Sequence, residues 1–168
     1  GDRLVLVTTD RVSAFDHVLG TIPWKGQILN AIALDAFERT KDILPNHLLD
    51  VPDANVMVAT RLRAHPIEFV VREYITGSLW RDYAAGRSHE YVELPPGLEK
   101  DQRLPMGPLL TPSTKAEQGL HDEPVSKEAL IARGLISKKQ LEEAEEAALA
   151  LFARGREIAA ARGLILVD

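Results

Sequence analysis

The feature that most constrains the fold is a long amphipathic helix predicted over residues 137–162. Ser137 and Gln140 have the spacing of a capping box, in which each side chain bonds the backbone of the other. At ~1.5 Å per residue the helix would span roughly 39 Å, which is the width of a domain. Its expected buried stripe follows helical spacing and consists of Leu141, Ala144, Ala148, Leu151, Phe152, Gly155, Ile158 and Ala159. Gly163 is expected to end the helix.

The rest of the chain mixes short strands with short helices, without a regular alternation of strand and helix, and this predicts an α+β fold. Strands are expected over residues 3–8, 17–22, 55–62, 66–75 and 164–167, and shorter helices over 27–39, 77–83 and 126–134. Thr76 or Ser78 is expected to cap the second of these helices, and Ser126 the third. Residues 93–124 are rich in proline and have little periodicity, which predicts a long loop.

Arg61–Pro66 connects two predicted strands and is expected to hold the domain boundary. Residues 1–62 would then form a small lobe with an antiparallel sheet, and residues 63–168 a larger mixed α+β domain.

The composition excludes several kinds of protein. The net charge is −5 and the lysines and arginines are scattered, which argues against a nucleic-acid partner. The absence of cysteine excludes disulfides, thiolate nucleophiles and Cys-based zinc sites. No apolar run approaches the ~18 residues of a membrane span, and the first residues lack a signal-peptide pattern. We expect a cytoplasmic protein with no membrane partner.

The first candidate site lies on and after the predicted strand of residues 66–75. Alternation along the strand places Glu68 and Arg72 on one face, where charged groups are costly unless they are paired or liganded. The Thr-Gly-Ser turn leads into a helix whose free N–H groups suit a phosphate, and Arg72 and Ser78 would add contacts. A structural Glu68–Arg72 pair with a plain helix cap explains the same residues equally well.

The second candidate is the polar stretch of residues 111–124, which contains hydroxyls, an amine, an imidazole and three carboxylates. Carboxylate oxygens suit Mg²⁺, which binds nucleotide phosphates through one or two protein carboxylates. The run His121-Asp122-Glu123 could hold a metal, a substrate ammonium group or a proton. Composition alone favours the alternative of a solvated polar loop.

The third candidate is the loop of residues 10–16 together with Lys25-Gly26. Aspartate and serine in a loop more often cap or turn the backbone than bind a ligand. Lys25 beside a glycine would either let an anion approach the backbone or close a turn. The chain contains no glycine-rich phosphate loop and no nucleophile elbow, so these residues support an anion site without identifying ATP.

Five segments taken together resemble the family of phosphoribosylaminoimidazole-succinocarboxamide synthases (SAICAR synthetases). They follow the family's order and spacing: Thr9–Asp16 (TDRVSAFD), Lys25-Gly26, Pro66–Ser78 (PIEFVVREYITGS), Thr111–Ser126 (TPSTKAEQGLHDEPVS) and Gly163–Asp168 (GLILVD). The resemblance implies an ATP-dependent ligase of de novo purine biosynthesis that uses Mg²⁺. ATP would phosphorylate the carboxylate of 5-amino-4-carboxyimidazole ribotide, and L-aspartate would then displace the phosphate. The first lobe is similar to the nucleotide lobes of kinases and ATP-grasp enzymes.

The resemblance also implies roles for individual residues. The expected catalytic residues are Glu68, Lys115 and Asp122. The expected substrate ligands are Asp10, Arg11, Ser13, Arg72, Ser78, Ser113, Lys115 and His121, with Arg72 and Ser78 on the ribotide 5′-phosphate. The nucleotide would contact Lys25, Ala59, Arg61 and Asp168. The metal would be held by Glu68, Asp122 and Asp168.

The sequence departs from the family pattern at both ends. It lacks the glycine-lysine strand over the ATP phosphates and the part of the Asp-Thr-Lys-aromatic-Glu-Phe-Gly motif that follows Asp168, including a metal-binding glutamate. We therefore expect an internal portion of the enzyme that does not complete the metal site. A sugar or inositol phosphate kinase and a non-catalytic ribotide-binding remnant remain as alternatives. The oligomeric state, including a homo-oligomer, is left open.

Overall fold

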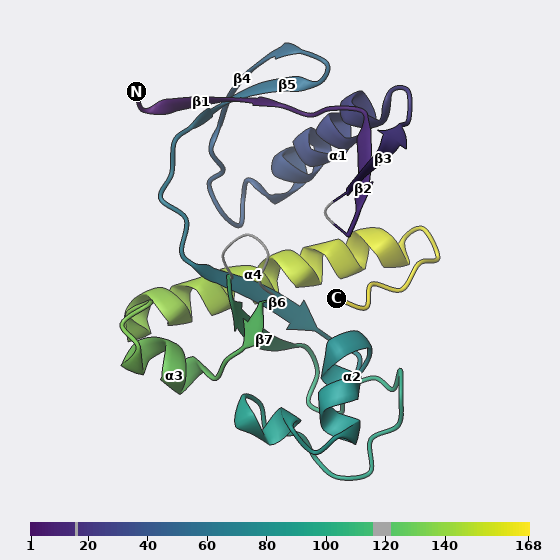
Figure 1. Ribbon diagram of the computed structural model, residues 1–168, viewed down its shortest axis with the longest axis vertical. Coiled ribbons are helices and arrows are strands. Elements are labelled where there is room, and N and C mark those ends of the chain that lie inside the picture. The colour runs from purple at the N-terminus through teal and green to yellow at the C-terminus, as the bar shows by residue number, and fades with distance from the viewer. Residues whose placement is uncertain (16, 116–121) are drawn as a thin grey trace. The chain divides into compact units, whose positions relative to one another are not determined.

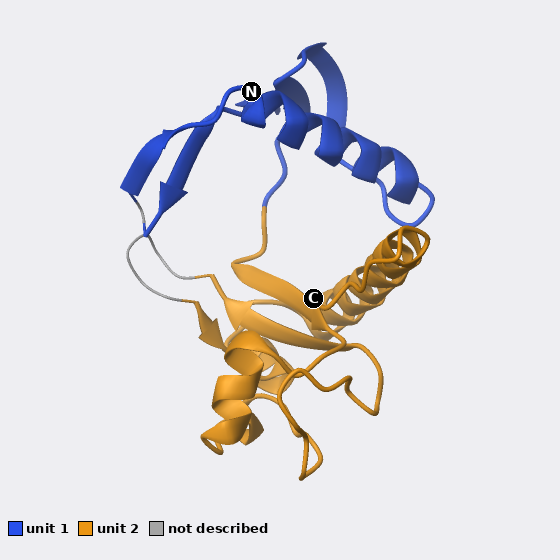
Figure 2. Cartoon of the chain, turned by 90° about the vertical axis from the view of Figure 1, so that its right-hand side faces the viewer, with its two compact units in different colours: residues 1–63 blue, residues 64–168 orange. Residues whose placement is uncertain are grey.

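The computed structural model describes residues 1–15, 17–115 and 122–168, and the chain divides into two compact units, residues 1–63 (unit 1) and 64–168 (unit 2) (Figure 2). The division falls between Arg63 and Ala64, one residue after the expected position. The sheets are antiparallel and each unit combines strands with helices (Figure 1). The predicted α+β fold class is confirmed.

Unit 1 consists of two small antiparallel sheets and one helix. Its elements are β1 (Arg3–Val7), β2 (Arg11–Ala14), β3 (His17–Thr21), α1 (Lys25–Thr40), β4 (Leu48–Asp53) and β5 (Val56–Thr60). One sheet has the strand order β1-β5-β4, and β2 pairs with β3 in the other. Helix α1 covers the predicted helix and extends slightly beyond it at both ends. Strands β2 and β4 lie where no strand was predicted.

Helix α1 begins where the backbone passes unusually close to Thr8. A Cβ atom on Gly26 would lie 2.3 Å from the carbonyl oxygen of Thr8, so only glycine fits at that position. The carboxylate of Asp10 accepts hydrogen bonds from the backbone N–H groups of Gly26 at 2.8 Å and of Trp24 at 3.3 Å. Asp10 therefore satisfies N–H groups that the start of a helix leaves without partners.

Unit 2 places a three-stranded antiparallel sheet against a long helix. Its strands are β6 (Ile67–Arg72), β7 (Leu109–Thr114) and β8 (Glu123–Pro124), in the order β6-β7-β8. Its helices are α2 (Gly77–Ala84), the 3₁₀ turn η1 (Ser88–Glu90), α3 (Lys127–Ala132) and α4 (Lys138–Ala160). Helix α4 contacts β6 and β7 and runs along them (Figure 1). The predicted capping box of Ser137 and Gln140 is present, and Ser126 caps α3 as expected.

The core of unit 2 forms three apolar clusters around the sheet. Ile67 packs with residues of α3 and the start of α4, Ile75 packs with Leu79 of α2, and Val71 packs with Phe152 of α4. Leu141 and Phe152 of the predicted α4 stripe are buried and the other stripe residues are half-buried. The odd-numbered residues of β6 thus face the core, which leaves the even-numbered ones for the opposite face.

Two predictions about unit 2 are wrong. The stretch expected to be a loop contains β7 and β8. Pro112 is tolerated within β7 because β8 is very short and pairs only with Ser113 and Thr114. Residues 164–167 form no strand. Val167 accepts one backbone hydrogen bond, from Glu73 at 3.1 Å, whereas a strand requires a continuing ladder of such bonds.

Candidate functional site

The candidate site is a cavity on the face of β6 that points away from the apolar clusters. The cavity has a volume of about 300 Å³ and brings together five of the residues expected in a site, namely Glu68, Arg72, Ser78, Ser113 and Asp122. The antiparallel register of β6 and β7 sets Glu68 directly opposite Ser113. All five residues belong to unit 2. The strand alternation predicted from the sequence therefore places Glu68 and Arg72 on one face, and the pairing of β6 with β7 adds Ser113.

The Arg72 guanidinium is the most constrained group in the cavity, and its side chain is 14% exposed. Its Nε donates to Oγ1 of Thr111 and its Nη2 to Oγ of Ser78, both at 3.2 Å. Its Nη1 donates to Oδ2 of Asp168 at 2.9 Å. Among the described residues, the acid that pairs with Arg72 is thus Asp168, and the alternative of a Glu68–Arg72 pair is not supported.

Ser78 lies in the first turn of α2, but it does not cap the helix. The N-cap residue of α2 is Thr76, and it makes no side-chain capping bond. The hydroxyl of Ser78 is turned toward Arg72 and accepts its hydrogen bond. Of the two predicted alternatives, Thr76 therefore occupies the N-cap position without a side-chain bond, and Ser78 is wrong because its hydroxyl binds the guanidinium and not the helix backbone.

The cavity also contains carboxylates that fit a hard cation. Glu68 and Asp122 both line it, and one or two carboxylates are the usual protein ligands of Mg²⁺. Across residues 1–15, 17–115 and 122–168, however, no three His, Asp or Glu residues are grouped so that they could hold a metal. Asp168, expected as a third metal ligand, is instead paired with Arg72. Within the described residues, Glu68 and Asp122 are therefore the expected metal ligands that line the cavity.

Two described residues of unit 2 that were expected in the site, Lys115 and Asp168, are not among those that line the cavity. Lys115 follows the end of β7, and its backbone N–H donates to the carbonyl of Pro66 at 3.0 Å. His121 lies outside the described residues.

The expected residues of unit 1 occupy several separate positions. Arg11 donates from Nε to Oγ1 of Thr9 at 3.1 Å, and Ser13 lies in β2. Lys25 is the first residue of α1, Ala59 is fully buried in β5, and the backbone N–H of Arg61 donates to Asp2 at 2.8 Å. Asp10, expected to face substrate, caps α1, which is the commoner role of a loop aspartate. The roles of these residues toward ligands remain predictions.

Glu73 is a buried charged residue that was not predicted as a site residue from the sequence. Its side chain is 2% exposed. Its Oε1 accepts hydrogen bonds from Nε of Arg103 at 3.0 Å and from Nη1 of Arg156 at 2.8 Å. Burial opposes ionisation, but the two guanidinium groups outweigh it and lower the pKa of Glu73. The strand alternation that puts Arg72 in the cavity puts Glu73 on the core side, and this could have signalled the buried acid.

Asp82 and Tyr91 line the cavity and were also missed. Oδ2 of Asp82 accepts the hydroxyl of Tyr91 at 2.8 Å, and Oδ1 accepts Nη2 of Arg87 at 2.7 Å. Burial raises the pKa of Asp82, but these two hydrogen bonds outweigh it and the net pKa is lowered. Burial and the bond to Asp82 raise the pKa of Tyr91, so its hydroxyl remains protonated. No local pattern in the sequence links these residues to β6.

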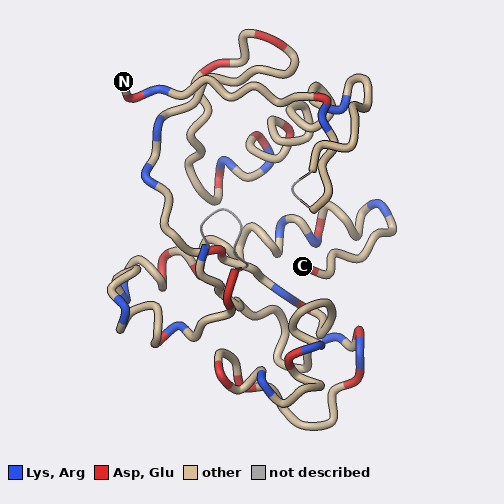
Figure 3. The backbone as a smooth tube through the Cα atoms, viewed as in Figure 1, with Lys and Arg blue, Asp and Glu red and all other residues tan. Residues whose placement is uncertain are grey.

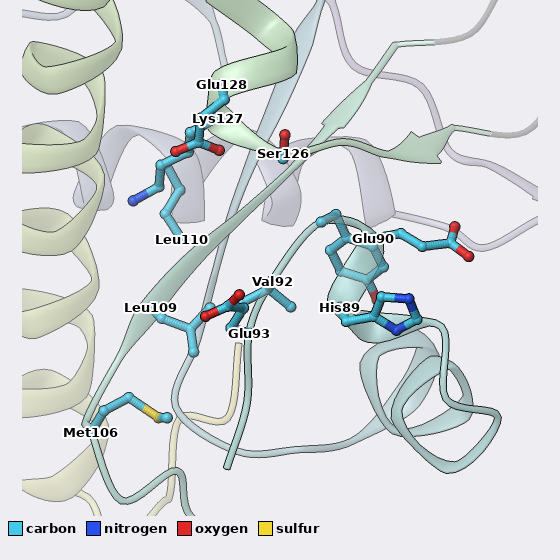
Figure 4. A pocket seen from close by; sticks show the side chains of 11 residues that line it. His89, Glu90, Val92, Glu93, Met106, Leu109, Leu110, Ser126, Lys127 and Glu128 are labelled. Atoms are coloured by element: carbon cyan, nitrogen blue, oxygen red, sulfur yellow. The ribbon is translucent and has the colours of Figure 1, made fainter.

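A larger hollow of about 630 Å³ lies between η1 and the start of α3 (Figure 4). It is lined by a mixture of apolar and acidic side chains with one lysine, Lys127, which pairs with Glu145 of α4. None of the residues expected in a site lines it. The smaller cavity, which does contain them, is therefore the candidate site.

Along the described backbone, lysine and arginine positions are interspersed with aspartate and glutamate positions (Figure 3). In the part of the chain that is described, no helix is both long and apolar enough to cross a membrane.

The whole chain, residues 1–168, matches the protein family described as SAICAR synthetase. A phosphoribosylaminoimidazole-succinocarboxamide synthase of Bacteroides thetaiotaomicron is 49% identical over 170 residues, which is 100% of this chain and 54% of that protein. The chloroplastic enzyme of the same name from Vigna aconitifolia is also 49% identical, over 100% of this chain and 50% of its own length. The chain thus spans about half the length of the curated relatives it matches.

Solved structures show the same fold. The SAICAR synthase of Saccharomyces cerevisiae, complexed with SAICAR, superimposes with a TM-score of 0.85 at 27% identity, covering 99% of this chain and 60% of that one. A SAICAR synthetase of Pyrococcus horikoshii has a TM-score of 0.81 at 24% identity, covering 99% of this chain and 68% of that one.

Proposed function

The chain belongs to the SAICAR synthetase family, and on that premise we propose that it serves in an ATP-dependent ligase that joins L-aspartate to 5-amino-4-carboxyimidazole ribotide. The observation that carries the proposal is the cavity in unit 2. Arg72 and Ser78, which suit a phosphate, line this cavity together with two carboxylates, Glu68 and Asp122.

Arg72 and Ser78 are proposed to bind the 5′-phosphate of the ribotide. A guanidinium forms charge-assisted hydrogen bonds to phosphate oxygens in a fork geometry, and the bond to Ser78 already fixes one of its nitrogens. Thr111 holds Nε on the other side, so the group is oriented before a ligand arrives. A pre-oriented guanidinium loses little freedom on binding, which favours affinity.

Glu68 and Asp122 are proposed to lie near the imidazole carboxylate and to hold Mg²⁺, whose hard oxygen ligands they provide. When bound, Mg²⁺ supplies positive charge that offsets the repulsion between a carboxylate and the γ-phosphate of ATP. Lys115 and His121 are proposed to contribute to the aspartate and ribotide pocket.

The proposed reaction has two steps that balance without any redox partner. An oxygen of the imidazole carboxylate takes the γ-phosphoryl group, so the bond from that group to ADP breaks and an acyl phosphate forms. The amine nitrogen of L-aspartate then attacks the acyl carbon, phosphate leaves with the electron pair of its C–O bond, and the nitrogen loses a proton. Activation is needed because a carboxylate is a poor electrophile.

Lys25, Ala59, Arg61 and Asp168 are each proposed to contact the nucleotide. Asp10, Arg11 and Ser13 are proposed to face the substrates. We further propose a cytoplasmic location and no nucleic-acid or membrane partner, while assembly into a homo-oligomer stays an open prediction.

The test is an assay of ADP release by the full-length protein. The proposal requires that release depend on both L-aspartate and the carboxylated ribotide. Release with a sugar or inositol phosphate and no amine would instead identify a small-molecule kinase. Calorimetry completes the test, because a non-catalytic remnant would bind the ribotide without any metal-dependent affinity for ATP.

A further inference from the structure

The charges that line the cavity do not by themselves favour a phosphate. The cationic side chains are Arg72 and Arg81, and the acidic ones are Glu68, Asp82 and Asp122. A phosphate monoester carries up to two negative charges at neutral pH, and like charges in a partly desolvated site repel strongly. At least one of these carboxylates must therefore be compensated by groups of the protein.

Asp82 is a carboxylate of the cavity wall that the protein itself compensates. Each of its two oxygens accepts a hydrogen bond, from the Tyr91 hydroxyl at 2.8 Å and from Nη2 of Arg87 at 2.7 Å. The side chain of Asp82 is 17% exposed, whereas that of Arg87 is 57% exposed and does not line the cavity. The bond from Tyr91 is the one made at the cavity wall itself.

We infer that Tyr91 is a positioning residue for the phosphate site, because it holds the Asp82 carboxylate in a fixed, hydrogen-bonded orientation that does not oppose an anion on Arg72. This inference rests on the assignment of the cavity to the ribotide phosphate. Without the tyrosine hydroxyl, one oxygen of Asp82 loses its partner. The carboxylate then exposes more of its charge to the cavity, and a bound phosphate is repelled.

The experiment is a calorimetric titration of the full-length protein with ribose 5-phosphate, in the absence of ATP and aspartate. Tyr91→Phe should raise the dissociation constant about three- to tenfold, less than a direct charged hydrogen bond would, because the effect acts through Asp82. Asp82→Asn should leave the dissociation constant unchanged or lower it. In the Asp82→Asn background, Tyr91→Phe should have no further effect.

Tyr83→Phe is the matched control for loss of a half-buried, hydrogen-bonded hydroxyl. Tyr83 lies on the same helix as Asp82, and its hydroxyl donates to the carbonyl of Pro95 at 2.9 Å and accepts the N–H of Leu98 at 3.1 Å. It does not line the cavity, so the dissociation constant should not change. The weakening caused by Tyr91→Phe should also diminish as salt is added, since screening reduces repulsion between charges.

Equal weakening by Tyr91→Phe in both backgrounds would show a purely structural tyrosine and would overturn the inference, as would weaker binding by Asp82→Asn alone. Unchanged binding by Tyr91→Phe would overturn it as well. If the unmodified protein does not bind ribose 5-phosphate, the assignment of the cavity to the ribotide phosphate fails. That result is distinct from the outcomes above, which concern only the variants.

Discussion

Nη1 of Arg72 lies 2.9 Å from Oδ2 of Asp168, although 96 positions separate the two residues in the chain. The preceding residue, Val167, is held just beyond the end of β6, where its carbonyl accepts a hydrogen bond from the backbone N–H of Glu73. Arg72, the last residue of β6, and the next residue, Glu73, thus bind the consecutive residues Asp168 and Val167. Asp168 therefore accepts a hydrogen bond from Nη1 of Arg72, a group that the proposed ribotide phosphate would also use.

We therefore expect Asp168→Asn to strengthen the binding of ribose 5-phosphate. Asp168 is 43% exposed, and ion pairs with one exposed partner are worth up to about 1 kcal/mol, so the gain should not exceed roughly fivefold. Calorimetry would measure it, with Glu99→Gln, a change at an exposed acid, as the control. Weaker binding would mean that Asp168 orients Arg72 and does not compete with the ligand.

Arg72→Ala should weaken ribotide binding far more than ATP binding. A charge-assisted hydrogen bond contributes about 1.5–3 kcal/mol, or roughly 10- to 150-fold in affinity. Dissociation constants for both ligands should be compared with those of Arg133→Ala, which removes an exposed arginine just after α3. An equal loss for the two ligands would identify Arg72 as a structural residue.

Asp122→Asn should raise the concentration of Mg²⁺ needed for half-maximal ADP release. The amide keeps the size of the carboxylate but removes the charge that a hard cation prefers. The neighbouring Glu123→Gln, at an exposed position in β8, serves as the control. An unchanged metal titration would argue against Asp122 as a ligand.

Asp10→Ala should lower the free energy of unfolding by about 0.5–2 kcal/mol, the usual cost of losing a helix cap. Stability falls because the substitution removes the hydrogen bonds that two backbone N–H groups at the start of α1 donate to the carboxylate. Urea denaturation would measure it, and Asp2→Ala, an exposed change, should have little effect. If stability is kept and only substrate affinity falls, Asp10 faces the ligand as the family resemblance implies.

Glu73→Gln should lower the free energy of unfolding by about 1–3 kcal/mol at neutral pH, since the guanidinium groups of Arg103 and Arg156 lose their ionised acceptor. The pKa of Glu73 is lowered in the folded state. Its contribution is therefore present above the unfolded pKa, near 4.5, and is lost as the pH falls through the folded value.

The difference in stability between the unmodified chain and Glu73→Gln should accordingly shrink in acid. Denaturant titrations at several pH values would show it, with Glu157→Gln on the exposed side of α4 as the matched control. A difference that stays constant with pH would mean that shape and not charge matters at this position.

The features that the sequence predicted well depend on neighbours along the chain. The capping box of α4 joins residues three apart, and the alternation of β6 repeats every two residues. These patterns were enough to predict that Glu68 and Arg72 share a face. The fold class follows from the same local signals.

The features that it did not predict depend on residues that meet only after folding. Strand β7 contains Pro112, whose missing N–H argues against a central strand. The strand becomes evident only from its pairing with β6 in the folded structure. Asp82 and Tyr91 reach the cavity from a segment with no regular periodicity. The pairing of Arg72 with Asp168 bridges nearly the whole of unit 2.

The strict alternation of β6 also fixes its length. A single residue inserted or deleted between Ile67 and Arg72 would turn every following side chain to the other side of the sheet. Phe69 and Val71 would then face water and Arg72 would be driven among hydrocarbon groups. Side-chain exchanges along β6 should therefore be tolerated more readily than insertions or deletions within it.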